Sequence, residues 1–142
     1  MTLSVRERIV RRVLERLTVA LAPVPVLRPP TAPITREAGV TALVIAESDR
    51  IETQANALVD RTLTIRLSVV AHGPDAFDDA DHALVRAHAE LMRDANLGGL
   101  ALAVREVDAD WETEDLDAGS VAMPARYEIR YRTQATDITV PG

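Results

Sequence analysis

The sequence contains no cysteine and no lysine, and only four of its 142 residues are aromatic. The absence of cysteine excludes disulfide bonds, thiolate catalysis and cysteine-ligated zinc or iron–sulfur centres. No apolar stretch approaches the roughly 18 residues that a membrane-spanning helix needs. The N-terminal segment is interrupted by arginine every few residues and lacks the pattern of a secretory signal. We therefore expect a protein that is intracellular when made and has no membrane segment.

The residues that are present are typical of one folded domain spanning 1–142. A hydrophobic content of 47% and a charged content of 27% suit a soluble two-layer core of this length. Five of the eight prolines lie in the segment 22–36, which predicts an extended connector without a helix or a central strand. This connector is either a stiff crossover between elements or a ligand for an SH3-type domain.

Charge is divided unevenly along the chain. The first 36 residues carry seven Arg and two Glu, a net charge of +5, whereas the rest carries nine Arg and twenty acids, a net charge of −11. Such a chain could associate head-to-tail with copies of itself, the basic part of one against the acidic part of the next. The basic N-terminal part could equally be an ordinary solvated helix face.

Hydrophobic periodicity predicts two helices and four strands. The first helix covers 3–21, with a capping box at Ser4 and Glu7, and the second begins after Gly73 and stops before residues 96–99. We expect Phe77, Ala80, Leu84, Ala87 and Leu91 to form the buried stripe of the second helix. Strands are predicted at 40–48, 61–71, 100–107 and 121–133, and 49–60 is a loop or a strand extension.

The resulting order, α-β-β-α-β-β, indicates an α+β fold. We predict two helices packed on a mainly antiparallel four-stranded sheet. In the last strand, Ala125, Tyr127, Ile129 and Tyr131 alternate with charged residues. The charged face carries Arg126, Arg130 and Arg132, for which Glu128 and acids on neighbouring strands are the expected partners.

The usual catalytic and metal-binding patterns are not found in the sequence. His82 and His88 are six residues apart, which places them on different faces of a helix and argues against a shared metal. There is no Gly-x-Ser-x-Gly elbow and no phosphate-binding glycine loop. The acidic run 106–117 does not have the Gly and Glu spacing of an EF-hand loop. We expect no catalytic residue, no cofactor and no metal.

The chain resembles the small tail-terminator and minor tail proteins of long-tailed bacteriophages and phage-derived particles. The resemblance covers about residues 55–137 and rests on GPDAFDDAD (73–81), LMRDANLGGLA (91–101), an acidic segment containing Trp111, and YEIRYRT (127–133). The Pro-rich segment 22–36 has no counterpart in it. These stretches are packing and turn signals in a familiar order.

The resemblance implies a structural role without catalysis. Proteins of this family form a hexameric ring on the head-proximal end of the tail tube, where they stop tube polymerisation and present the surface to which the head attaches. The expected partners are further copies of the chain, the tail tube protein and a head–tail connector or neck protein, with DNA only passing through the channel. The protein would then reside in the virion tail or neck after assembly in the bacterial cytoplasm.

Three groups of residues are candidates for the subunit or partner interface. They are the basic helix face, the acidic segment around the only tryptophan, and the charged face of the last strand: Arg8, Arg11, Arg12; Trp111, Glu114, Asp115, Asp117; Arg126, Arg130, Arg132. Trp111 is either a lid on the sheet or an anchor against the next subunit. Acids of the run 106–117, or those at the start of the second helix, are expected to line the channel.

Two other functions remain open. The chain could be another neck component, such as a head-completion or stopper protein of similar size. It could also be a small cellular enzyme or a ligand-binding domain whose site the sequence does not reveal.

Overall fold

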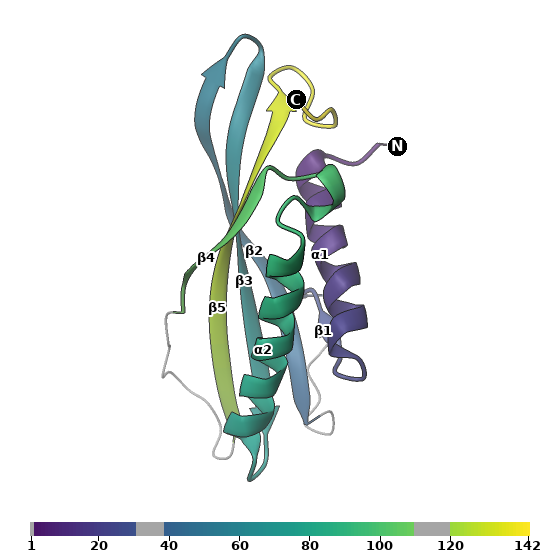
Figure 1. The fold of residues 1–142 in the computed structure, drawn as a ribbon, viewed down its shortest axis with the longest axis vertical. Coiled ribbons are helices and arrows are strands. Elements are labelled where there is room, and N and C mark those ends of the chain that lie inside the picture. Colours follow the sequence, from purple (N-terminus) through teal and green to yellow (C-terminus); the bar gives the residue numbers. More distant parts are fainter. Residues whose placement is uncertain (1, 31–38, 110–119) are drawn as a thin grey trace.

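The fold has two layers, with two helices packed on one face of a five-stranded sheet (Figure 1). It is seen in a computed structural model that describes residues 2–30, 39–109 and 120–142. The helices are α1 and α2, followed by a short 3-10 turn, η2, and the strands run in the spatial order β1-β2-β3-β5-β4. Their bounds are α1 Val5–Leu21, β1 Val26–Leu27, β2 Val40–Ala55, β3 Leu58–His72, α2 Ala76–Arg93, η2 Leu97–Gly99, β4 Ala103–Asp108 and β5 Ser120–Gln134.

The predicted four-stranded, mainly antiparallel sheet is wrong, because the sheet is mixed and has five strands. The additional strand, β1, lies inside the Pro-rich segment and pairs in parallel with β2, Val26 opposite Ala42 and Leu27 opposite Leu43. The prolines permit this because an edge strand uses the hydrogen-bonding groups of only one side. The Pro25 carbonyl accepts the first bond, from the Ala42 amide at 2.9 Å.

The strands predicted at 40–48 and 61–71 are parts of one long hairpin. Strands β2 and β3 stay paired from Val40 and Ala71 to Ala55 and Leu58, so residues 49–60 are mostly strand extension. Two residues with positive φ, Asn56 and Ala57, form the turn, as a tight two-residue hairpin requires. The tip of this hairpin projects beyond the ends of both helices (Figure 1).

Helix α1 follows the sequence pattern closely. The Ser4 side chain accepts a hydrogen bond from the Glu7 amide at 3.1 Å and caps the first turn. The side chains that recur at three- and four-residue steps form one buried face against the sheet. They are Val5, Ile9, Val10, Val13, Leu17 and Leu21, each no more than 1% exposed.

Helix α2 packs through alanine, and the buried stripe predicted for it is only partly right. Its buried residues are Ala76, Ala80, Ala83, Ala87 and Leu91. Phe77, expected in the stripe, is 63% exposed, and Leu84 is only partly buried. Alanine side chains let the helix axis approach the sheet closely, so the buried face is centred on the small residues and Phe77 is turned outward.

The core between the layers includes both tyrosines of β5. The predicted alternation of this strand is confirmed: Tyr127, Ile129 and Tyr131 are buried on the helix side, at 2% exposure or less. The Tyr127 hydroxyl lies 2.7 Å from His88 Nδ1 on α2, and the Tyr131 hydroxyl donates to the Asp49 carboxylate on β2. Burial, with the nearby Glu106 charge, raises the pKa of Tyr127 to about 12. No helix in the described ranges combines the length and the apolarity needed to cross a membrane.

We expect Ala83→Leu to lower the free energy of unfolding by about 1–3 kcal/mol, because the added methylene groups have no space between α2 and the sheet. The matched control is Ala89→Leu, since Ala89 is exposed on the same helix. Urea unfolding followed by circular dichroism measures both. Equal losses for the two variants would contradict the close approach of α2 to the sheet.

Candidate functional site

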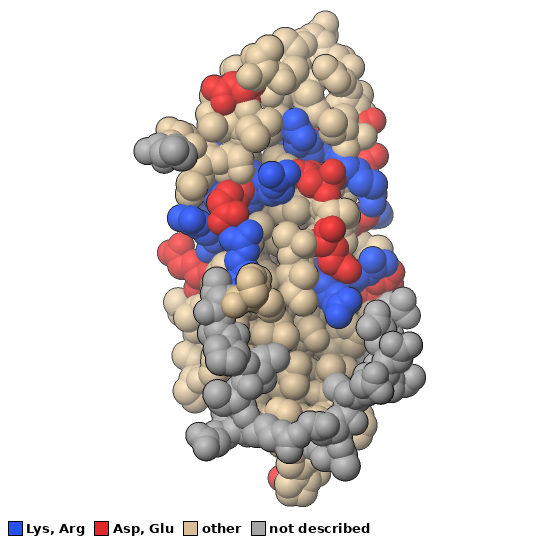
Figure 2. Space-filling model, turned by 180° about the vertical axis from the view of Figure 1, so that it is seen from behind, with Lys and Arg blue, Asp and Glu red and all other residues tan. Residues whose placement is uncertain are grey.

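The face of the sheet that carries no helix is the most distinctive surface of the described residues. Arginines and carboxylates alternate across the middle of this face (Figure 2). They belong to four strands; residues two apart in a regular strand share a face, and irregularities in β2 and β4 bring further charged residues to the same side. The set consists of Glu47, Arg50, Glu52, Asp60, Arg66, Arg105, Asp108, Arg126, Glu128, Arg130 and Arg132.

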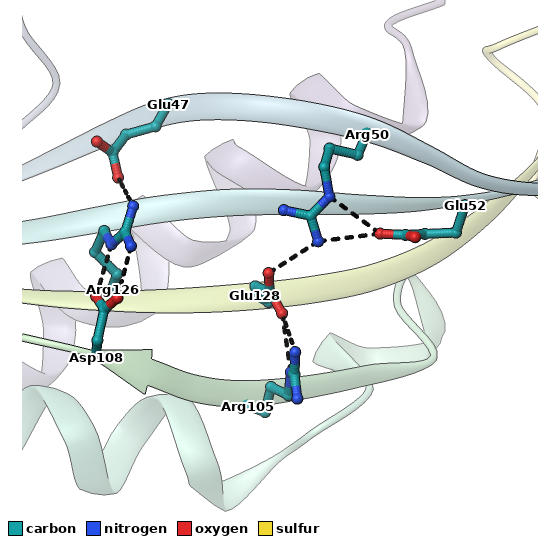
Figure 3. Close-up of polar contacts among 7 residues, drawn as sticks. All are labelled: Glu47, Arg50, Glu52, Arg105, Asp108, Arg126 and Glu128. Atoms are coloured by element: carbon teal, nitrogen blue, oxygen red, sulfur yellow. Dashed lines mark hydrogen bonds and ion pairs between the residues drawn. The ribbon is translucent and has the colours of Figure 1, made fainter.

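Glu128 of β5 lies at the centre of this surface, between Arg105 of the adjacent strand β4 and Arg50 of β2, which lies beyond β3 (Figure 3). One of its carboxylate oxygens accepts from Arg105 Nε of β4 at 2.9 Å, and the other accepts from Arg50 of β2 at 3.0 Å. The Glu128 side chain is only 8% exposed, whereas those of Arg50 and Arg105 are 53% and 68% exposed. The Arg105 hydrogen bond is the main reason that the pKa of Glu128 lies below its ordinary value.

Arg126 is held by a fork of two hydrogen bonds to the Asp108 carboxylate, at 2.7 and 2.6 Å (Figure 3). This geometry depends on an irregularity in β4: the pairing shifts between Glu106 and Asp108, so that Asp108 stands opposite Arg126. A regular ladder would place residue 108 opposite Ala125, on the other face. Glu47 of β2 lies 3.7 Å from the same guanidinium.

Arg132 is paired in the same manner, with Asp60 of the neighbouring strand β3. Its Nε donates to the Asp60 carboxylate at 2.6 Å, and a second nitrogen donates at 3.2 Å. These bonds lower the pKa of Asp60, as the Arg126 bonds lower the pKa of Asp108. The arginines of this face are therefore largely neutralised by acids of the same chain.

Arg130 is the exception. It is exposed and forms no ion pair within the part of the chain that the structure describes. Its side chain borders an open cavity of about 490 Å³ on the helix-free face. We call this cavity the arginine pocket; its lining residues are Arg50, Glu52, Thr62, Ala103, Arg105, Glu128 and Arg130. Three guanidinium groups face two carboxylates there, so the pocket can accept a further anionic group.

The three arginines predicted on α1 lie in the other layer and serve the chain itself. Arg8 donates to the Thr139 carbonyl, and Arg12 donates to the Leu97 carbonyl at 2.9 Å. Arg11 is 61% exposed and pairs with Glu7 one turn earlier, at 3.0 Å. They are thus separated by the sheet from Arg126, Arg130 and Arg132. The other predicted interface residues, Trp111, Glu114, Asp115 and Asp117, lie outside the described residues.

Sequence reasoning did not identify Arg50 and Arg105 as members of the surface. Arg50 lies in the segment 49–60, for which the sequence pattern allows either a loop or a strand extension, so the pattern does not assign its side chain to a face of the sheet. Glu128 carried a signal, because it stands between Arg126 and Arg130 on the polar face of an otherwise alternating strand. Its partners come together only because β4 pairs with β5 on one side and β2 pairs with β3 on the other.

Two observations on the described residues bear on metal binding and catalysis. No cluster of three or more His, Asp or Glu side chains within 2–30, 39–109 and 120–142 could hold a metal ion. His72 Nδ1 lies 2.6 Å from the Ser120 hydroxyl, and the two side chains correspond to the nucleophile and the base of a nucleophile–base–acid arrangement. Its other ring nitrogen is buried without a hydrogen-bond partner, so the orienting acid is missing there.

Comparisons with known proteins do not place the chain in a family. No protein-family model and no curated protein matches it. One solved structure, of a protein with no descriptive name, is 18% identical and covers 87% of this chain and 92% of its own, with a TM-score of 0.45. A likeness at that level carries no argument about fold or function.

We expect Glu128→Gln to reduce the free energy of unfolding by about 1–3 kcal/mol, because two arginines lose a charged, largely buried acceptor. The matched control, Glu52→Gln, removes an acid whose side chain is 41% exposed, and should cost no more than about 0.5 kcal/mol. Urea unfolding measures both. Similar losses in the two variants would show that Glu128 has no central role.

A comparison of the parent protein with Glu128→Gln also predicts how stability depends on pH. The pKa of Glu128 is lowered in the folded protein, so its contribution is complete above the ordinary pKa of a glutamate and is lost as the pH falls through the folded value. The stability difference between the parent and Glu128→Gln should therefore be constant from neutral pH down to about 5 and shrink only in more acidic buffer. A difference that shrinks already between pH 7 and 6, by urea unfolding at each pH, would contradict this.

Proposed function

We propose that the protein is a structural component that assembles with copies of itself into a ring, and that it acts as a tail terminator of a long-tailed phage or phage-derived particle. The observation that carries this proposal is the helix-free sheet face, on which ordered Arg–carboxylate pairs surround the arginine pocket. Arginine held in place by a carboxylate is well suited to a subunit interface, because its ordering cost is already met before association.

The projecting β2–β3 hairpin supports an assembly role. Beyond the helices its two strands have only each other and the end of β5 as partners. There β3 stays paired with β5 as far as Leu58 opposite Gln134, so the projecting sheet is narrow and carries no helix, and a neighbouring subunit can pack against its faces (Figure 1). Ile51, on this part of β2, is 60% exposed and offers an apolar contact.

In this role the ring caps the tail tube, stops its polymerisation and presents the surface for the head. The partners are the tail tube protein and a connector or neck protein, the location is the virion tail or neck, and no catalysis is involved. These points rest on the resemblance of residues 55–137 to the family.

A ligand-binding domain is the second candidate, and one observation favours it. The arginine pocket is large enough for a small anion, which would be attracted by Arg130, a residue without an ion pair to any described residue. A shift of the melting temperature by millimolar phosphate or citrate, in a protein that stays monomeric, would favour this candidate over the ring.

We expect the purified chain to form a closed oligomer of one size. Size-exclusion chromatography with light scattering gives the mass, and negative-stain images show whether the particles are rings. The proposal predicts that this particle shortens tail tubes when it is mixed with polymerising tube protein. A protein that stays monomeric at every concentration measured, or that leaves tube length unchanged, would overturn it.

We expect the free protein to bind duplex DNA only weakly at physiological salt. Arg126 and Arg132 are neutralised by Asp108 and Asp60, so few positive charges are available to release counterions from phosphates. A ring that lets DNA pass benefits from this weak adhesion. Fluorescence anisotropy with a labelled duplex measures it, and Asp60→Asn/Asp108→Asn, which removes one carboxylate charge beside each arginine, should bind more tightly. Tight binding by the parent protein would contradict the role as a passive channel.

A further inference from the structure

One side of helix α2 faces neither the sheet nor α1. Phe77 and Val85 on this side are 63% and 61% exposed. Asp81 lies between them at the same helical spacing, and Asp78 is adjacent, both exposed. We call these four residues the α2 face. Neither aspartate forms an ion pair with a described residue. The α2 face thus offers an aromatic ring and two free carboxylates on one helix surface.

The arginine pocket has the complementary chemistry. It contains Arg130 without an ion pair, and Arg50 and Arg105 already oriented by Glu128. A guanidinium group can stack on an aromatic ring face and can also bind a carboxylate. The side chains of Thr62 and Ala103 also line the pocket and add uncharged contact surface. What the pocket lacks is negative charge, and the α2 face supplies it.

We infer that the α2 face of one copy docks into the arginine pocket of the next copy. In this contact Phe77 lies against the guanidinium groups, and Asp78 and Asp81 compensate Arg130. The inference rests on the proposed function, since it names the surfaces by which the ring closes. The charge complementarity of the two surfaces selects a second copy of the chain as the occupant of the pocket.

The positions of the two surfaces determine the type of assembly. Helix α2 covers one side of the sheet (Figure 1), and the charged side chains that line the arginine pocket lie on the other (Figure 3). One molecule cannot bring its own α2 face to its own pocket, and the contact joins unlike surfaces. Repetition of such a head-to-tail contact produces a closed ring when the rotation between neighbours closes, and a filament otherwise.

Charge exchange tests the contact. Arg130→Glu places an acid opposite Asp78 and Asp81, and Asp78→Arg/Asp81→Arg places cations opposite Arg130. Each change juxtaposes like charges, so the subunit concentration for half-dissociation should rise roughly tenfold or more. The triple variant that carries both changes restores opposite charges between copies and should return toward the parent value. Because the sheet separates the two surfaces within a chain, such a recovery acts between subunits.

Control variants distinguish effects on folding from effects on assembly. Glu15→Arg reverses an exposed acid on α1 and should assemble like the parent. Asp78 lies in the first turn of α2, where an acid stabilises the helix. Asp78→Asn/Asp81→Asn is therefore measured as well, with a thermal melt of each variant. Phe77→Ala should weaken assembly about tenfold, whereas Val19→Ala, at a residue 77% exposed on α1, should not.

Each outcome separates the inference from the proposed function. If the parent forms rings and the reversed variants do so equally well, this contact is wrong and the ring is built by another surface. Weakened assembly of the two charge-reversed variants without recovery in the folded triple variant also overturns the pairing. A parent chain that is monomeric throughout overturns the proposed function, and the inference with it. Loss in Arg130→Glu and in Asp78→Arg/Asp81→Arg, with recovery in the triple variant, supports the contact.

Discussion

The structure depends on the alternation of side chains along β5, a strand that is hydrogen-bonded on both sides. Its neighbour β3 pairs with it from Ser120 to Gln134, and β4 pairs with it from Arg126 to Arg130. Successive residues must therefore point to opposite faces. Tyr127, Ile129 and Tyr131 fill the core beneath the helices, and the residues between them are directed to the helix-free face. One strand thus organises the packed layer and the charged surface together.

The charged surface shows why a nearly buried carboxylate is tolerated. Removing Glu128 from water is unfavourable, but the guanidinium groups of Arg50 on β2 and Arg105 on β4 satisfy its oxygens. Arg50 and Arg105 remain half-exposed and keep their contact with solvent, which lowers the desolvation cost of the whole group. The result is a set of arginines that are ordered and still accessible to another molecule.

Helix α2 buries a face of small alanine side chains and exposes larger apolar side chains to solvent. Alanine residues bury little surface, yet they allow the helix to lie close to the sheet, where backbone and β-carbon atoms pack well. The larger apolar residues Phe77 and Val85 are then excluded from the core. In the proposed ring Phe77 and Val85 contribute to association between subunits instead.

The sequence by itself determined the elements with a regular hydrophobic period. The cap and buried face of α1, the alternation of β5 and the position of α2 follow from spacing alone, since these signals are local. Tertiary structure decided the rest. Strand β1 exists because Val26 and Leu27 meet the edge of β2, and no local pattern reveals such a two-residue pairing. The inward face of α2 was decided by close packing, which favoured alanine over Phe77. Asp108 meets Arg126 only because β4 shifts its register, and Glu128 meets Arg50 and Arg105 only because β2, β3, β5 and β4 lie side by side. Contacts between residues far apart in the chain depend on the register and the order of the strands, and the hydrophobic pattern of the sequence specifies neither.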